Sequence, residues 1–316
     1  MLLTTLAVVL GAACERASGT DASSEGPHTG PSGAADAGEC DPHVRVGRFE
    51  LQTYKETAII QGNVHTAPSP LARLEEVSAQ GGCALVRQQR FFCDPRCAAD
   101  EVCGPGDACI TRPRPRSVGE VTVQGLGEDL RLLPVEPGFV YFDTSRPKSA
   151  IEAGEPVWLE ASGGDMDVEP IELGVVGIAA LHVSTGMTLV VAHGAPLDVA
   201  WDAAVAEHDA EIVLRLQVDQ HGGTPASVVC RFEDTGSGIV PAGILAKFLD
   251  LGITGFPNAT ITRLVASRTP GAEDCVDFVA SASLEIGLSV DNVTPCHSDA
   301  DCPPGQTCNK QIEICE

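Results

Sequence analysis

Cysteine is the residue that most constrains how this chain can fold. The 316 residues include thirteen cysteines, and eight of them lie in two short clusters with almost no apolar side chains between them. A segment without a hydrophobic core of its own needs covalent cross-links to hold one conformation. We therefore expect an exported protein, whose disulfides form in an oxidising compartment. Because thirteen is odd, at least one cysteine must lie outside the disulfides within the chain.

The two clusters contain copies of one motif. Residues 97–109 read CAADEVCGPGDAC and residues 296–308 read CHSDADCPPGQTC, and both fit C-x2-D-x2-C-x-P-G-x2-C. The Pro-Gly pair predicts a tight turn between the second and third cysteines. Cys93 precedes the first copy and Cys315 follows the second, so each cluster holds four cysteines. Within each cluster we expect two local bridges that alternate along the chain.

Twelve cysteines are thus expected in disulfides: Cys40, Cys83, Cys93, Cys97, Cys103, Cys109, Cys230, Cys275, Cys296, Cys302, Cys308 and Cys315. Outside the clusters we expect Cys40 to pair with Cys83 and Cys230 with Cys275, although sequence alone does not determine connectivity. Structural zinc is the alternative for the clusters. Zinc sites usually separate paired cysteine ligands by two to four residues, whereas five residues separate them here, so disulfides are favoured.

The thirteenth cysteine, Cys14, follows a short apolar leader. Residues 1–13 carry no charge and predict a signal peptide, since the stretch is too short to span a bilayer as a helix. The small residues before Cys14 resemble the bacterial lipobox, in which the cysteine is acylated and becomes the mature N-terminus. The resemblance implies lipidation at Cys14 and an anchor at the cell envelope, in the outer membrane or at the cell surface. A secretory peptidase would accept the same bond, so free secretion is the alternative.

The composition changes along the chain and predicts its organisation. Residues 14–39, with no aromatic residue and no Ile, Leu or Val, predict a disordered tether behind the lipidated cysteine. Residues 40–110 predict a small β unit that ends in the first cluster. The alternating prolines of residues 111–117 predict a stiff linker. Residues 118–292 predict a larger β-sandwich domain, and residues 293–316 a C-terminal cysteine-rich module.

Short runs of alternating apolar and polar residues predict the fold class. Residues 211–218 are an example, and such runs, bounded by Gly, Pro and Asp, favour half-buried antiparallel strands. We expect a mainly β protein, with an antiparallel β-sandwich or barrel-like body, one short helix and disulfide-stapled segments. The helix is predicted over Val240–Leu251, with one apolar stripe formed by Ile244, Leu245, Phe248 and Leu251. The long run Val276–Val290 predicts two strands.

Charge limits the classes of partner. The chain has 20 basic and 44 acidic residues, a net charge of −24. This argues against a nucleic-acid binder, which needs a basic face to displace counterions from phosphate. It also argues against electrostatic docking on anionic lipid. Contact with the membrane is therefore expected through the lipid anchor only.

Candidate catalytic chemistry is limited to one acidic motif. Residues 234–237 read DTGS, the tetrapeptide of aspartic proteases, in which two carboxylates share a proton. Arg231 and Glu233 stand where those enzymes place apolar residues, and the chain has no second copy. A turn that leaves a strand is the favoured interpretation. Asp234 is the candidate acid of the alternative function, an extracellular hydrolase that acts on peptide or glycan.

Metal binding has two weak candidates. Asp165, Asp167 and Glu169 occupy alternate positions and could converge on calcium. They lack the glycine and the distant glutamate of an EF-hand, so a solvated acidic hairpin is favoured. His193 and His221 both lie beside glycine at predicted strand ends and could hold a metal together, but surface positions are favoured. We expect no catalytic residue and no cofactor other than this calcium.

The motifs carry a loose resemblance to known exported proteins. The segment CHSDADCPPGQTCNKQIEIC is similar to cysteine-rich repeats of the Dickkopf N-terminal type. The wider layout, with FFCDPRCAADEVC, SVGEVTVQGL and DQHGGTPASVVCRFEDTG, resembles uncharacterised cysteine-rich lipoproteins of myxobacteria. This implies a location rather than an activity. We expect a non-enzymatic binding or structural module of the bacterial envelope, whose partner is a protein or polymer met there mainly by the cysteine-rich ends.

Overall fold

The computed structural model describes residues 35–316 except 55, 71–73, 165–167, 205–209, 218–225, 254–255 and 272–273. The predicted signal peptide, Cys14 and most of the predicted tether lie outside these residues. Asp165 and Asp167 of the calcium hypothesis and His221 of the metal hypothesis also lie outside them. No helix in the described part of the chain is long and apolar enough to cross a bilayer.

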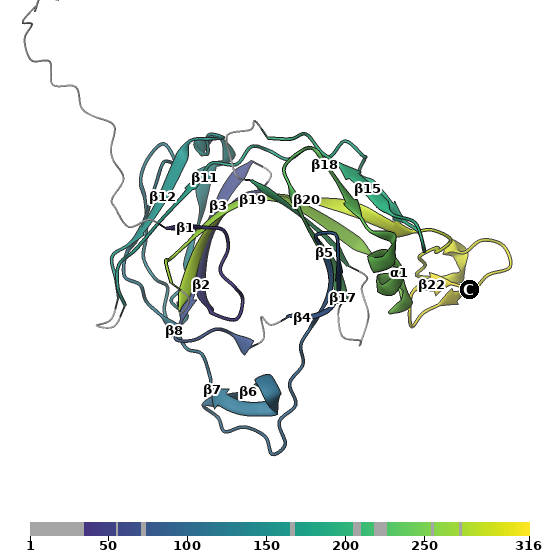
Figure 1. The fold of residues 1–316 in the computed structure, drawn as a ribbon, viewed down its shortest axis with the longest axis horizontal. Helices are drawn as coiled ribbons and strands as arrows, with labels where there is room; N and C mark the ends of the chain where they lie inside the picture. Colours follow the sequence, from purple (N-terminus) through teal and green to yellow (C-terminus); the bar gives the residue numbers. More distant parts are fainter. Residues whose placement is uncertain are drawn as a thin grey trace, which may run out of the picture. The chain divides into compact units, whose positions relative to one another are not determined.

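The fold is mainly β, as predicted, and is built on one large sheet (Figure 1). Twelve strands of the described residues belong to it. Nine follow one another in the order β11 (Tyr141–Pro147), β3 (Thr57–His65), β2 (Arg45–Tyr54), β20 (Cys275–Val290), β19 (Asn258–Arg268), β16 (Glu211–Gln217), β17 (Ala226–Glu233), β5 (Cys83–Gln88) and β4 (Leu74–Gln80). Three join at the side: β1 (Asp36–Ala37), β14 (Thr188–Val191) and β8 (Pro115–Arg116).

Smaller elements complete the described fold. A second sheet has the order β10 (Leu130–Leu132), β9 (Val121–Gln124), β12 (Pro156–Ala161) and β13 (Ile171–Val176). Three two-stranded sheets are β15 (Leu197–Ala200) with β18 (Ser237–Val240), β6 (Glu101–Gly104) with β7 (Ala108–Thr111), and β21 (Cys308–Asn309) with β22 (Ile314–Cys315). The helical segments are α1 (Ala242–Asp250) and the 3-10 turns η2 (Pro105–Asp107), η3 (Lys148–Ala150) and η4 (Asp299–Asp301).

The run predicted as two strands is the single strand β20. One edge of β20 pairs with β19 over Asp277–Gly287. Its other edge is shared, because β2 lies along its first half and β14 along its second half. Both of these partners run parallel to β20, so the sheet is mixed rather than purely antiparallel. The two predicted strands are therefore the two halves of one continuous strand, and each half has a different neighbour on this edge.

The two β units expected on either side of residues 111–117 share one sheet. Strand β2 pairs with β20, β3 pairs with β11, and β5 pairs with β17, so the segments before and after the predicted linker interleave. The linker itself contributes β8, which pairs with β3. Residues from 34 to 316 form one compact unit. The predicted boundary is thus corrected, because each unit's strands find hydrogen-bonding partners in the other.

One face of the large sheet is buried in two places. Beside β2, β3 and the first half of β20 it packs against the second sheet, with Phe49, Tyr141 and Leu159 in the core. Beside β5, β16 and β17 it packs against α1, β15 and β18, with Ile212 and Phe248 in the core. Figure 1 shows the large sheet curved, with these smaller layers outside the curve. This layering gives the sandwich-like body that was expected.

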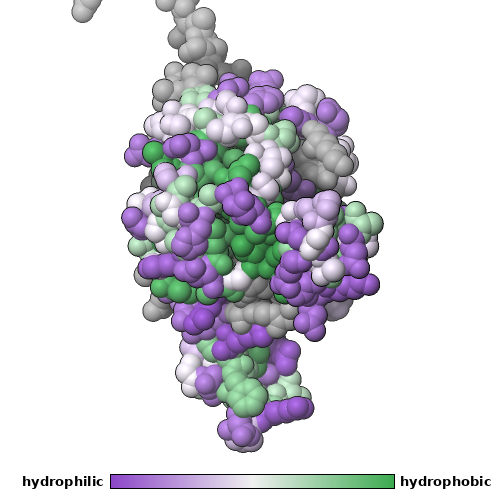
Figure 2. All heavy atoms as spheres, turned by 90° about the vertical axis from the view of Figure 1, so that its right-hand side faces the viewer, coloured by the Kyte–Doolittle hydropathy of each residue, from purple (hydrophilic) through white to green (hydrophobic). Residues whose placement is uncertain are grey.

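Helix α1 lies within the range predicted for it, but the residues that it buries differ from the predicted apolar stripe. Ile244, Leu245 and Phe248 are buried as expected, together with Leu249. Leu251 is 45% exposed, because the helix ends at Asp250 and Leu251 is its C-cap. Figure 2, viewed from the side of α1, shows apolar surface between hydrophilic regions on this face.

Candidate functional site

The cysteine clusters are cross-linked as predicted. The bridges alternate in both: Cys93–Cys103 and Cys97–Cys109 in the first cluster, and Cys296–Cys308 and Cys302–Cys315 in the second. A sulfur in a disulfide is not a thiolate and cannot serve as a zinc ligand. The zinc alternative therefore loses its ligands in both clusters.

The other two bridges differ from the prediction. Cys40 pairs with Cys275, and Cys83 pairs with Cys230. Cys83 of β5 lies directly opposite Cys230 of β17 in the large sheet, with their Cα atoms 3.9 Å apart. Cys40 precedes β2, which lies beside the start of β20 where Cys275 stands. The expected pairing was wrong because it assumed two separate β units.

The two motif copies use their polar residues to hold their own loops. Both motif turns carry a glycine at positive φ, Gly106 at 71° and Gly305 at 93°, a conformation that costs glycine little. In the second copy Asp299 accepts a hydrogen bond from the Cys308 amide at 2.8 Å. Asp301 caps η4 and accepts bonds from two preceding amides. These short segments are thus rigid and polar.

Asp234 lies in a buried ion pair. Its side chain is 5% exposed and that of Arg263 is 2% exposed, and the Arg263 Nε donates to Asp234 Oδ2 at 2.7 Å. The indole of Trp201 donates to Asp234 Oδ1 at 2.7 Å, and the Ala204 amide donates to Oδ2 at 3.2 Å. A general acid must hold a proton and reach a substrate. A carboxylate that accepts bonds on both oxygens inside the core suits a structural role instead.

Arg263 finds partners for the rest of its guanidinium in the backbone. Its Nη1 donates to the carbonyl oxygens of Ala180 at 3.1 Å and Ala179 at 3.4 Å. Its Nη2 donates to the carbonyl of Asp202 and, at 3.3 Å, to Asp234 Oδ1. The ion pair therefore fixes the segments around residues 179 and 202 against β19. A buried charge is tolerated only when it is paired and hydrogen-bonded in this way.

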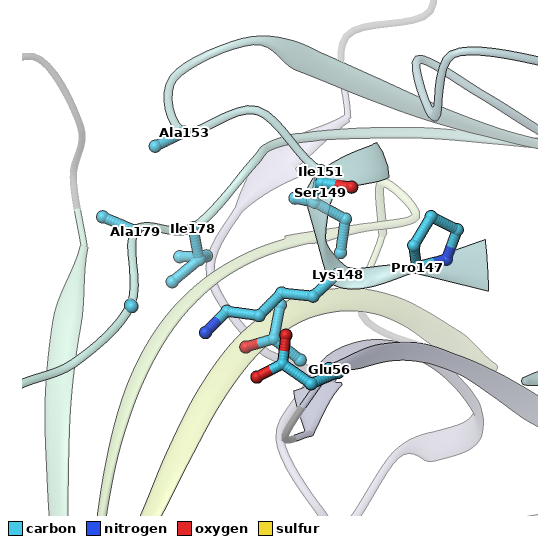
Figure 3. Close-up of a pocket in the computed structure, with 10 residues that line it drawn as sticks. Glu56, Pro147, Lys148, Ser149, Ile151, Ala153, Ile178 and Ala179 are labelled. Atoms are coloured by element: carbon cyan, nitrogen blue, oxygen red, sulfur yellow. The ribbon is translucent and has the colours of Figure 1, made fainter.

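A groove opens beside this network (Figure 3). It has a volume of about 470 Å³, within the range of small-molecule sites. Its wall combines polar and apolar residues: Thr53, Glu56, Pro147, Lys148, Ser149, Ile151, Ala153, Ile178, Ala179 and Ala180. A smaller cavity of about 90 Å³ adjoins it and is lined by Ala153, Gly177, Ile178, Ala179, Ala204, Ala210 and Arg263.

The charged residues of the groove come from adjacent chain segments. Glu56 precedes β3, and Lys148 follows β11 in the turn η3. Pairing of Pro147 with Thr57 brings these ends together, and the Lys148 amide donates to the Glu56 carbonyl at 2.9 Å. Figure 3 shows the Lys148 side chain extended along the groove, with the Glu56 carboxylate lining it as well.

The polar face of the large sheet carries a second charged cluster. Arg48 binds the fully buried Asp277 through two hydrogen bonds of 2.9 and 2.8 Å. Glu39 bridges Arg48 on β2 and Arg231 on β17, at 2.7 Å from the latter. Burial raises the pKa of Glu39, but both arginines, through charge and hydrogen bonds, hold its pKa below the ordinary value of 4.5. One carboxylate thus ties together strands separated by three others in the sheet.

Of the remaining metal candidates, the structure describes only Glu169 and His193. Glu169 is exposed, and the other two acids of the calcium hypothesis lie outside the described residues. His193 is exposed and its Nε2 lies 3.2 Å from an oxygen of Asp250, at the end of α1. Trp201 is buried with Leu197 and Val199.

No known protein family matches the chain, and no curated protein is significantly similar to it.

Sequence reasoning missed Arg263, Lys148 and Glu56. A signal for Arg263 was present, because it stands two residues from Ile261 and from Val265 and would share their face in a strand. A charge at such a position implies a buried partner. Lys148 and Glu56 had no such signal, since their proximity depends on the pairing of β3 with β11 across more than eighty residues.

Proposed function

We propose that this chain is an exported lipoprotein, anchored through Cys14, that acts as a non-enzymatic binding module at the cell envelope. One observation carries the anchor. The twelve cysteines of residues 40–315 pair with one another, which leaves Cys14 as the odd cysteine. Acylation explains a single cysteine left over in an exported chain. The six disulfides support an oxidising compartment.

Three features support binding rather than catalysis. The candidate acid Asp234 is engaged on both oxygens by Arg263, Trp201 and a backbone amide. The cysteine-rich ends present polar loops on a cross-linked scaffold, where recognition is often placed. The groove beside η3 offers a small-molecule site with opposite charges. The partner proposed for the cysteine-rich ends is a protein or polymer of the envelope.

The anchor is tested by replacing its cysteine. We expect the wild-type protein in the membrane fraction, labelled by an alkyne fatty acid, and the Cys14→Ser protein in the soluble fraction without label. Ser18→Ala, in the same polar segment, is the matched control and should stay at the membrane. Peptide mapping without reduction should find the same six bridges in all three proteins. A wild-type protein that is soluble and unlabelled would contradict the anchor.

The role of the C-terminal cluster is tested by removing it whole. Both of its bridges lie within residues 296–315, so a chain that ends at Thr294 loses no other disulfide. Val293, which packs against the main core, is retained. We expect the full chain to recover envelope partners that the shortened chain does not. Equal recovery by both would limit this cluster to a structural role.

A further inference from the structure

The groove and the smaller cavity are neighbours that share part of their lining. Ala153, Ile178 and Ala179 line both. The outer part holds about 470 Å³ and the inner part about 90 Å³. A ligand can therefore place a polar head in the groove and a small group in the cavity.

The outer part presents one positive and one negative side chain. Lys148 and Glu56 both line the groove, and neither makes an ion pair with another residue in the described part of the chain. Lys148 is half-buried and Glu56 is exposed. The backbone bond from the Lys148 amide to the Glu56 carbonyl holds the two residues in register. Two charges of opposite sign in the lining of one groove complement a ligand that carries both signs.

The inner part favours an apolar group. Its lining is alanine, glycine and Ile178, apart from Arg263. The charge of Arg263 is already balanced by Asp234, and its N–H groups are bonded to that carboxylate and to backbone carbonyls. A charged group in this cavity would lose its hydration without gaining a partner. The volume is below the roughly 150 Å³ of a cavity that accepts benzene, so a short aliphatic group fits better than an aromatic ring.

We propose that this site binds a small zwitterion with a short aliphatic group, such as a free aliphatic α-amino acid. The ligand's ammonium pairs with Glu56, its carboxylate pairs with Lys148, and its side chain fills the inner cavity. A ligand with one charge removed leaves the opposite residue without its partner. The inference deepens the binding role proposed above by naming a ligand class, and it rests on the groove rather than on the anchor.

Calorimetry with the purified protein tests the ligand class. L-valine is the probe, N-acetyl-L-valine lacks its positive charge, and L-valinamide lacks its negative charge. We expect L-valine to bind, and each derivative to bind at least tenfold more weakly. L-tryptophan should not bind, because its ring exceeds the inner cavity. If L-valine produces no binding heat up to millimolar concentration, or if either derivative binds equally well, the proposal is wrong.

Variants locate the binding in the groove. Lys148→Met and Glu56→Gln should each weaken L-valine binding at least tenfold. Their matched controls, Lys310→Met and Glu160→Gln, change exposed residues elsewhere and should bind as the wild type does. Ala179→Leu should abolish binding, because Ala179 lines both the groove and the cavity and the larger side chain would occupy the space of the ligand. Ala153→Leu, at an exposed position of the same wall, gives a second measurement if the first variant unfolds. Unchanged affinity in both charge variants would overturn the assignment.

The two proposals fail separately. Calorimetry uses the purified chain, and its result does not depend on Cys14. A protein that binds L-valine but is never lipidated would contradict the anchor alone. A lipidated protein that binds no zwitterion would contradict the groove assignment alone.

Discussion

At the scale of single residues, the fold should be especially sensitive to mutation of the buried ion pair between Arg263 and Asp234. Both side chains are nearly inaccessible to water. Removing one partner of a buried ion pair leaves the other charge without compensation. The carbonyl oxygens of Ala179, Ala180 and Asp202 would then lose their alignment with the guanidinium. The pair therefore holds the wall of the groove as well as the core.

Asp234→Asn should be strongly destabilising. We expect a loss of about 3–5 kcal/mol in the free energy of unfolding, because the Arg263 charge stays buried without its counter-charge. Urea denaturation followed by circular dichroism measures it. Asp198→Asn, at an exposed position of β15, is the matched control and should change stability by less than about 0.5 kcal/mol. Similar stability of the two variants would show that the pair contributes little.

Glu39 should contribute a pH-dependent part of the stability. Its pKa in the folded protein lies below 4.5, because the charges and hydrogen bonds of Arg48 and Arg231 outweigh the effect of burial. A carboxyl with a lowered pKa stabilises the fold above its unfolded pKa, and that contribution disappears as the pH falls through the folded pKa. Glu39→Gln should therefore be less stable than wild type at pH 7. The difference should shrink as the pH falls below about 4.5. A difference that stays constant with pH would argue against this role.

At the scale of elements, periodicity predicted strands well and their partners poorly. The strand predicted over residues 211–218 is β16, which covers Glu211–Gln217. Alternation is a local property, so it locates strands without their neighbours. The single strand β20 was divided because sixteen residues exceed an ordinary strand. The short strand β13 was missed, because glycine and acidic residues interrupt its alternation.

Helix α1 should depend on its corrected apolar stripe. Leu249 is 8% exposed and Leu251 is 45% exposed. We expect Leu249→Ala to cost about 2–5 kcal/mol, because it leaves a cavity beneath the helix. Leu251→Ala should cost far less, because its side chain is partly hydrated already. Chemical denaturation of the two variants compares them directly. Equal losses in stability would show that Leu251 packs as closely as Leu249, as the sequence periodicity predicts.

At the scale of the whole molecule, the long-range bridges explain what sequence could not provide. Cys40–Cys275 and Cys83–Cys230 span 235 and 147 residues, and they connect strands that interleave. The local bridges of the clusters span 10 to 13 residues, and the repeated motif predicted them correctly. The groove was equally beyond prediction, since Glu56 and Lys148 come together only when β3 pairs with β11. Local spacing determines local bridges, whereas topology determines the others.

Reductant should open the two classes of disulfide one after the other. Both sulfur pairs of the long-range bridges belong to buried residues, at 3% exposure or less. In the first cluster Cys109 is exposed and Cys97 is partly exposed, and neither cluster has a large core. We expect Cys97–Cys109 to be reduced first and Cys83–Cys230 last. Differential alkylation with mass spectrometry measures this order.

Proteolysis should follow the same order. With the cluster bridges open, residues 93–109 and 296–315 lose the cross-links that replace a core, and protease should cleave them first. The body should resist, because its two core clusters and two buried bridges remain. Each long-range bridge contributes up to roughly 5 kcal/mol by the loop-closure argument, against roughly 3 kcal/mol for a short loop. Replacing Cys40 and Cys275 together by alanine should therefore lower stability more than replacing Cys97 and Cys109. Early cleavage inside 118–292 under mild reductant would contradict this order.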